Sequence, residues 1–299
     1  MSSEPRPAET ANGHKTQKSE LKNEEASRPP WDETAPTFVQ TPEPGWTFGS
    51  GANDTHVRAS TSAATAKHVA IDPFAPDRKA LDNYRLLVSG VVPRPIALIS
   101  TRSPDGTVEN LAPMSFFQMV NIDPPILAVG LTSSLKEAKD TLLNLVQSRE
   151  CVINVVSEGF IEAVNATSIN APFGVSEWEI AGLTPVHDCH TVSCARVKES
   201  IFSIEARLES VREFTSRSNP GKKSGCLVLL EVTYFWARED ALNEDKNHLD
   251  LAVLRPMSRL GGNMYGKTTH VMELNRPDFE KDLNGFEGLE KLKEAKEKQ

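Results

Sequence analysis

Hydrophobic residues from about residue 71 onward occur in short runs separated by turn residues, a pattern typical of a compact domain rich in β-strands. The runs are rich in Val, Ile, Leu and Phe, which suit the half-buried surface of a sheet. Strands are predicted over residues 92–101, 107–111, 125–132, 150–156, 202–214 and 226–237. The Ser-Pro-Asp-Gly turn at residues 103–106 folds the first two into a hairpin. These strands suffice to close a small barrel.

Two predicted helices interrupt the strands. The first covers residues 141–147 after Asp140, a good N-cap residue, and the second covers residues 158–167 after Ser157. Because strands dominate and strand and helix do not alternate regularly, the sequence favours a mainly β, Greek-key-type barrel with inserted helices over a doubly wound sheet. The chain contains neither GxGxxG nor GxxxxGK[ST], so a Rossmann or P-loop nucleotide site is not expected.

The two ends of the chain differ from this middle part. Residues 1–70 are rich in Ser, Thr, Glu, Pro, Ala and Lys, and they contain too few apolar residues to offset the entropy of ordering, so we expect a mostly disordered arm. Trp46 and Phe48 interrupt the arm; docking on the folded core and a loosely held apolar spot are equally open for them. Residues 275–299 read as a charged helix or tail. The predicted domain therefore covers residues 71–274.

Charge and composition narrow the partners and the compartment. The formal net charge of −8 argues against nucleic-acid or anionic-membrane surfaces, which require a basic footprint, and it favours a small-molecule partner. The first residues contain no signal or transit pattern, and no apolar run approaches membrane-spanning length. The four cysteines form no CxxC pair. Reduced, buried thiols and a cytoplasmic location are therefore expected.

A series of short motifs follows one order along the chain. They read RPIALIST at residues 94–101, NLAPMSFF at 110–117, DPP at 123–125, KDTLLN at 139–144, NVV at 154–156, GVSEW at 174–178 and AGLT at 181–184. Each is weak alone, but their number, order and spacing form a strong signal. Over residues 84–265 the chain resembles the flavin-reductase-like family of FMN-binding split barrels, which includes flavoredoxin.

The resemblance implies a split β-barrel that holds FMN at a homodimer interface, with the flavin ring against the backbone of residues 112–115. It favours cofactor contacts for the motif residues, and it associates Gly261, Gly262 and Tyr265 with a late segment that closes the site. The candidate cofactor-binding residues are Arg94, Pro95, Ser100, Thr101, Ala112, Pro113, Ser115, Ser133, Ser134, Lys139, Thr141 and Asn165.

Residue chemistry supports part of this set. Lys139 and Thr141 stand at a predicted helix start, where free backbone N–H groups and the helix dipole add to the lysine charge in binding a phosphate. As N-cap, Asp140 is expected to turn its carboxylate onto backbone N–H groups. Small residues at 112–115 allow close approach to a flat ring, and Ser115 adds a hydroxyl.

Several roles stay open at this stage. Spacing alone leaves Arg94 open to cofactor contact or to a surface ion pair, and the resemblance favours the cofactor. For Ser133, Ser134, Asn154 and Asn165, structural and cofactor roles are equally open.

Two other chemistries find less support. His187, Cys189, His190 and Cys194 crowd into one polar loop, but their spacing matches no standard zinc arrangement, and a metal site is disfavoured. The nucleophile elbow Gly-x-Ser-x-Gly is absent, which leaves a hydrolase little support.

The leading hypothesis is an FMN-dependent oxidoreductase that uses NADH or NADPH to reduce flavin or a small acceptor. A flavin takes hydride directly from a stacked nicotinamide, so the protein supplies position and electrostatics, and no catalytic side chain is expected. The alternative is an FMN-binding electron carrier or sensor without NAD(P)H turnover, which needs the same pocket. The sequence contains no motif that separates NADH from NADPH.

Overall fold

The computed structural model describes residues 24–52 and 67–297, which divide into two units between Thr34 and Ala35. Residues 24–34 contain one short helical turn, and all elements discussed below belong to the second unit. Much of the arm predicted to be disordered lies outside the described residues. Within the arm, β1 (Thr37–Phe38) pairs in parallel with β14 (His270–Val271), so the arm joins a C-terminal segment there.

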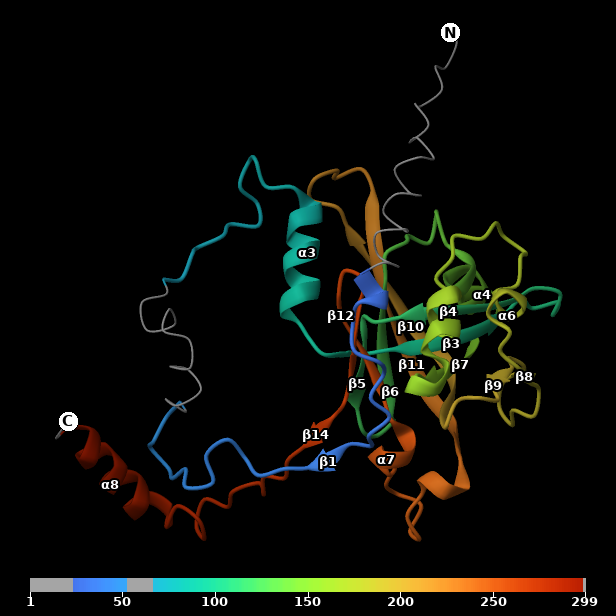
Figure 1. The fold of residues 1–299 in the computed structure, drawn as a ribbon. Helices are drawn as coiled ribbons and strands as arrows, with labels where there is room; N and C mark the ends of the chain where they lie inside the picture. The colour runs from blue at the N-terminus through green and yellow to red at the C-terminus, as the bar shows by residue number, and fades with distance from the viewer. Residues whose placement is uncertain (1–23, 53–66, 298–299) are drawn as a thin grey trace. The chain divides into compact units, whose positions relative to one another are not determined.

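A seven-stranded antiparallel sheet forms the main body of the second unit (Figure 1). Its strands in spatial order are β4 (Glu109–Met114), β3 (Ala97–Arg102), β7 (Glu150–Val155), β10 (Phe202–Thr215), β11 (Lys223–Ala237), β6 (Ile126–Leu131) and β5 (Phe117–Asn121). The edge strands β4 and β5 do not pair with each other, so the sheet stays open. The predicted mainly β architecture with inserted helices is confirmed.

Two smaller sheets flank this body. One contains β13 (Met264–Lys267), β12 (Met257–Gly261) and β2 (Arg94–Pro95), and the other pairs β8 (Pro185–Val186) with β9 (Arg196–Val197). All six predicted strands overlap observed ones. The first divides at Ile96 into β2 and β3, so its two parts join different sheets.

The helices are short, and not all of them lie against the sheet (Figure 1). They are α3 (Ala80–Gly90), α4 (Asp140–Ser148), α5 (Ile161–Ala166), α6 (Glu177–Ala181), α7 (Leu251–Leu254) and α8 (Gly285–Glu297), with 3₁₀ turns at Glu158–Phe160 and Glu239–Ala241. Helix α3 packs against β12, whereas α4 packs against β3. Within the described residues, no helix is both long and apolar enough to cross a membrane.

The start of α4 corrects one expectation. The helix begins at Asp140, its N-cap is Lys139, and no side chain caps it. The prediction that Asp140 caps this helix is therefore wrong. The carboxylate instead belongs to the first helical turn.

Strand β3 has a continuous apolar run in its sequence because both of its faces are buried. Successive side chains of a strand point to opposite faces, and both faces of β3 are buried. Ala97 and Ile99 belong to a core that includes Leu142 and Leu145 of α4. Leu98 belongs to a second core, together with Ile96 just before the strand and residues of α5 and α6. The end of β4, which pairs with β3, is thereby fixed from two sides.

Candidate functional site

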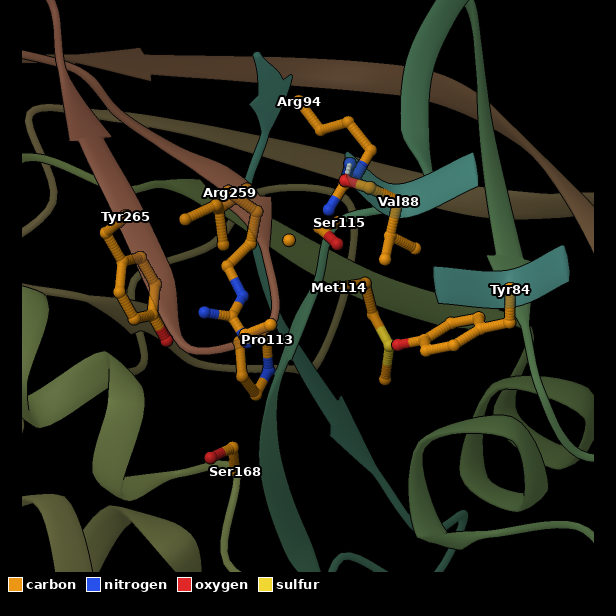
Figure 2. Close-up of a pocket in the computed structure, with 12 residues that line it drawn as sticks. Tyr84, Val88, Arg94, Pro113, Met114, Ser115, Ser168, Arg259 and Tyr265 are labelled. Carbon is orange, nitrogen blue, oxygen red and sulfur yellow. Dashed lines mark hydrogen bonds between the residues drawn. The ribbon is translucent and has the colours of Figure 1, made fainter. Parts of the chain in front are cut away.

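Two pockets meet at Pro113 and Met114, at the end of β4. The first, here named the lysine pocket, has a volume of about 310 Å³ and is lined mainly by Ala112, Thr132, Ser133, Lys139, Thr141 and Glu177. The second, the arginine pocket, has a volume of about 180 Å³ and is lined mainly by Tyr84, Arg94, Ser115, Arg259, Gly261 and Tyr265 (Figure 2). Pro113, Met114 and Ser168 line both pockets.

The N-terminus of α4 gives the lysine pocket its positive end. The backbone N–H groups of Asp140, Thr141 and Leu142 lie in the first helical turn, where an α-helix offers them no intrahelical partner, and no side chain caps this end. All three residues line the pocket. Lys139 stands at the same end, exposed and without an ion pair in the described part of the chain. Free donors, the helix dipole and the lysine charge therefore favour an anion there.

Acidic groups lie in the lysine pocket as well. Glu177 is 6% exposed, and its Oε2 accepts a hydrogen bond from the Leu111 backbone N–H at 3.2 Å. Burial raises the pKa of Glu177, and the nearby charge of Asp140 raises it further. Glu177 therefore takes up a proton more readily than an exposed glutamate, which reduces the negative charge at this wall.

A buried polar layer fixes α4 on the sheet. Asn110 Nδ2 donates to Thr141 Oγ1 at 2.9 Å, and Asn144 Nδ2 lies 3.4 Å from Thr101 Oγ1. All four side chains are buried. Thr141 accepts one hydrogen bond from the fold, and its own hydroxyl proton stays available to the pocket.

The arginine pocket depends on a contact between strands far apart in sequence. Arg94 on β2 lies opposite Arg259 on β12. The Arg94 guanidinium donates to the carbonyl oxygens of Val88 and Val91, each at 2.6 Å, while its buried Nε has no partner. Arg259 lies over the Tyr265 ring, 4.4 Å from its centroid. The residues lining this pocket include no carboxylate, so its potential is positive.

Of the predicted site residues, seven line one or both of the pockets and five line neither. The structure gathers Ala112, Pro113, Ser133, Lys139 and Thr141 in the lysine pocket, and Arg94, Pro113 and Ser115 in the arginine pocket. Pro95, Ser100, Thr101, Ser134 and Asn165 line neither pocket.

These five residues have other surroundings. Pro95 is exposed on β2, and Ser100 and Thr101 are buried in β3. Ser134 Oγ accepts from the Glu137 backbone N–H at 3.1 Å, and Asn165 Oδ1 accepts from the Tyr265 hydroxyl at 2.8 Å. Cofactor contacts of these residues stay predictions.

The loop with crowded histidines and cysteines is held by a buried carboxylate. Glu205, 0% exposed, accepts from the backbone N–H groups of His190 at 2.8 Å and Thr191 at 2.6 Å, and from Trp236 Nε1 at 2.7 Å. The His190 ring stacks on Tyr234 at 4.6 Å. Nowhere in residues 24–52 and 67–297 do three or more His, Cys, Asp or Glu side chains gather as metal ligands.

Comparison with known protein families identifies the family of this chain. A family model described as "Flavin reductase like domain" matches residues 89–255. The chain belongs to this family. The resemblance stated from the sequence motifs is therefore confirmed.

Known relatives of this flavin reductase-like chain align with it over most of their own length. An uncharacterized protein of Halalkalibacterium halodurans is 36% identical over 208 residues, which are 69% of this chain and 96% of the relative. A solved structure, nitrilotriacetate monooxygenase component B from Bacillus cereus, is 30% identical with a TM-score of 0.64 and covers 70% of this chain and 100% of its own. Another, 2-nitrobenzoate 2-nitroreductase from Pseudomonas fluorescens, is 28% identical with a TM-score of 0.59 and covers 71% of this chain and 98% of its own.

A third structure bears on the fold alone. A protein described as a flavin reductase with a split barrel domain, from Shewanella frigidimarina, has a TM-score of 0.59 at 20% identity and covers 71% of this chain and 100% of its own. The predicted split-barrel fold is confirmed.

The site residues of this flavin reductase-like chain fit a flavin nucleotide. A flavin mononucleotide has a flat ring and a dianionic phosphate. The Pro113–Met114 wall contains no β-branched side chain, so a flat ring can approach its backbone. The uncapped start of α4 offers free donors for the phosphate. Arg94 lines the pocket on the other side of the wall, and its buried Nε has no hydrogen-bond partner.

Sequence reasoning missed Arg259, Ser168 and Glu177 as pocket residues. Arg259 lies two positions before the Gly261-Gly262 pair, so that pair was the available signal. Glu177 belongs to a motif of the resemblance, but its carboxylate enters the site only because α6 packs on β4. For Ser168 the sequence contains no signal.

Proposed function

We propose that the chain is an FMN-dependent oxidoreductase that takes electrons from NADH or NADPH and reduces flavin or a small acceptor. One observation carries the proposal. The uncapped start of α4, with the free charge of Lys139, and the positive arginine pocket meet at the same Pro113–Met114 wall. Residues 71–274 are the proposed functional domain.

In this proposal the phosphate of FMN binds at Lys139, the Thr141 hydroxyl and the free N–H groups of the first turn of α4. The backbone of Pro113 and Met114 supports one face of the ring, and Ser115 donates to or accepts from its polar edge. When bound, FMN supplies the two-electron chemistry. The protein binds, orients and shields the reactants, and no side chain of this chain is assigned as acid or base.

The protein is further proposed to act as a homodimer. Helix α3, the edge strand β5 and the residue that follows β5 expose apolar side chains, among them Leu87 (63%), Met119 (62%) and Ile122 (83%). Tyr84 of α3 contacts Phe116 next to β5, with ring centroids 6.5 Å apart. An exposed apolar edge strand invites pairing with another chain, and a second copy is the simplest cover. Light scattering of the purified protein measures this state.

The cytoplasm is the proposed compartment. All four cysteines are free thiols, and Cys151, Cys194 and Cys226 are buried. Burial raises the pKa of Cys194 to about 12, which keeps this thiol protonated and unreactive. Such thiols suit a reducing environment.

Two measurements test the function. Fluorescence titration should show that FMN binds more tightly than riboflavin, by roughly ten- to a hundredfold, because only FMN has the phosphate. Equal affinities would contradict the phosphate site. Steady-state oxidation of NADH and NADPH by the FMN-loaded protein then separates a reductase from an electron carrier or sensor, which shows no turnover with either.

A further inference from the structure

We infer that the arginine pocket is an anion subsite for the second substrate, and that Arg259 binds a phosphate or carboxylate group of the molecule that exchanges electrons with the flavin. The inference rests on the proposed function. It names the charge class of that substrate and a binding residue that the sequence motifs did not reveal.

The first support is the arrangement of two like charges. Arg94 and Arg259 are direct partners in the register of β2 and β12. Like charges directly opposite each other on antiparallel strands are destabilising. Neither arginine forms an ion pair with any described residue, and no carboxylate lines the pocket. A bound anion would compensate this pair.

The second support is a donor without a partner. Arg94 is 9% exposed, and its Nε is buried without a hydrogen bond, although Nη1 of the same guanidinium binds two backbone carbonyls. Leaving such a donor unpaired costs free energy. Ser115 also lines this pocket and adds a hydroxyl (Figure 2).

The third support is that Arg259 is held in place before any ligand arrives. Its Nη2 donates to the Gly262 carbonyl oxygen at 2.7 Å, and its guanidinium stacks on Tyr265. A guanidinium fixed in this way loses little freedom on binding, and its planar fork matches an oxyanion.

The position of the pocket assigns it to the second substrate. Pro113 and Met114 line both pockets, so a flavin whose phosphate lies at Lys139 extends along this wall toward the arginine pocket. A volume of about 180 Å³ admits an anionic group but not a whole dinucleotide. The group comes either from the phosphates of NADH or NADPH or from a carboxylate on the acceptor.

Steady-state kinetics of the full-length, FMN-loaded protein tests the inference. One arm varies NADH or NADPH with riboflavin as the neutral acceptor, and the other varies 2-nitrobenzoate as an acidic acceptor at saturating donor. Arg259→Gln should raise the KM of one of these substrates about tenfold or more, with a smaller change in kcat. The arm that responds identifies the source of the anion. Arg259→Lys should recover part of the loss, because it keeps the charge but not the fork.

Arg212→Gln is the matched control. Arg212 also lies over an aromatic ring, that of Phe214, but it lines neither pocket. Its kinetics should equal those of the wild type. Unchanged KM in both arms for Arg259→Gln would overturn the inference. A loss of FMN affinity in Arg259→Gln as large as the rise in KM would also overturn the inference, because the pocket would then bind the flavin.

Failure of the proposed function can be told apart from failure of this inference. If the wild type oxidises neither NADH nor NADPH, calorimetric titration of the purified full-length protein with pyrophosphate and with 2-nitrobenzoate still tests the subsite. Binding of either probe that Arg259→Gln weakens supports it. Absence of binding of both probes overturns it.

Discussion

The lysine pocket and the arginine pocket share the Pro113–Met114 wall but are built from different parts of the fold. The lysine pocket combines a helix start with the edge strand β4, and its lining contains the carboxyl groups of Asp140 and Glu177 as well as the Lys139 cation. The arginine pocket combines two short strands and α3, and its two cations face no carboxylate. In the lysine pocket, carboxyl groups partly balance the positive charge, and an anion would bind through several donors. In the arginine pocket no carboxylate balances the two cations, so a bound anion would be the group that does so.

The difference predicts where a lost charge matters most for FMN. Lys139→Ala removes the free cation at the α4 start, and a charge-assisted contact of this kind contributes roughly 1.5–3 kcal/mol, or about ten- to a hundredfold in affinity. FMN affinity should fall by that factor in a fluorescence titration. The hydride-transfer rate at full FMN occupancy should change little, because the phosphate lies far from the reacting end of the ring.

Lys136→Ala is a suitable control, since Lys136 is exposed near the same helix but lines neither pocket. If Lys139→Ala binds FMN as the wild type does, Lys139 is an ordinary solvated residue. A large loss of rate at full occupancy would instead put the reacting end of the site at the lysine pocket.

The second prediction concerns the wall of the arginine pocket. Gly261 has φ +105°, and a Cβ at this position would lie 2.8 Å from the Val88 carbonyl oxygen of α3. Gly261→Ala should therefore destabilise the protein by roughly 1–3 kcal/mol and lower its Tm. Gly262→Ala is the matched control: Gly262 has φ +52° and open space around it, so its loss should be smaller. Equal losses would mean that α3 does not pack closely on β12.

The sequence predicted the two pockets unequally. Strands with both faces buried, such as β3, leave continuous apolar runs, and the start of α4 is visible from local residues. The arginine pocket needs the pairing of β2 with β12, which no local pattern encodes. Helix α3 was missed because only Val88 among its residues is buried, so its apolar periodicity does not mark an inner face.

The same reasoning explains why strand β5 was not predicted from the sequence. Strand β5 exposes four of its five residues, and it shows no alternation of buried and exposed positions. Its apolar residues Met119 and Val120 therefore resemble a loop in sequence. If they are covered by a second copy of the chain, the pattern that defines β5 belongs to the dimer and not to the single chain.

The third prediction separates the two roles of Thr141 in the lysine pocket. Thr141→Val keeps the shape but leaves the buried Nδ2 of Asn110 without its acceptor, so stability in a denaturant titration should fall by about 1–2 kcal/mol. Thr141→Ser keeps the hydroxyl and should retain most of that stability. If Thr141 also binds the phosphate, the valine variant loses FMN affinity while the serine variant does not. Equal FMN affinity in all three proteins would limit Thr141 to a structural role.

The smallest predicted effect comes from the acid that distinguishes the lysine pocket from its neighbour. Burial raises the pKa of Glu177, so the folded protein favours its protonated form more than the unfolded chain does. Stability from this group is therefore fully present at acidic pH and is lost as pH rises through the raised value.

Glu177→Gln keeps an oxygen to accept from the Leu111 N–H but cannot ionise. Relative to the wild type, the variant should gain stability in the window from the ordinary glutamate range toward neutral pH, with little difference at more acidic pH. Unfolding curves at both ends of the window measure the trend, and Glu179→Gln on the exposed side of α6 is the matched control. A trend of the opposite sign would mean that the wall of the lysine pocket favours the ionised carboxylate, and Lys139 would then have to offset two full negative charges when it binds a phosphate.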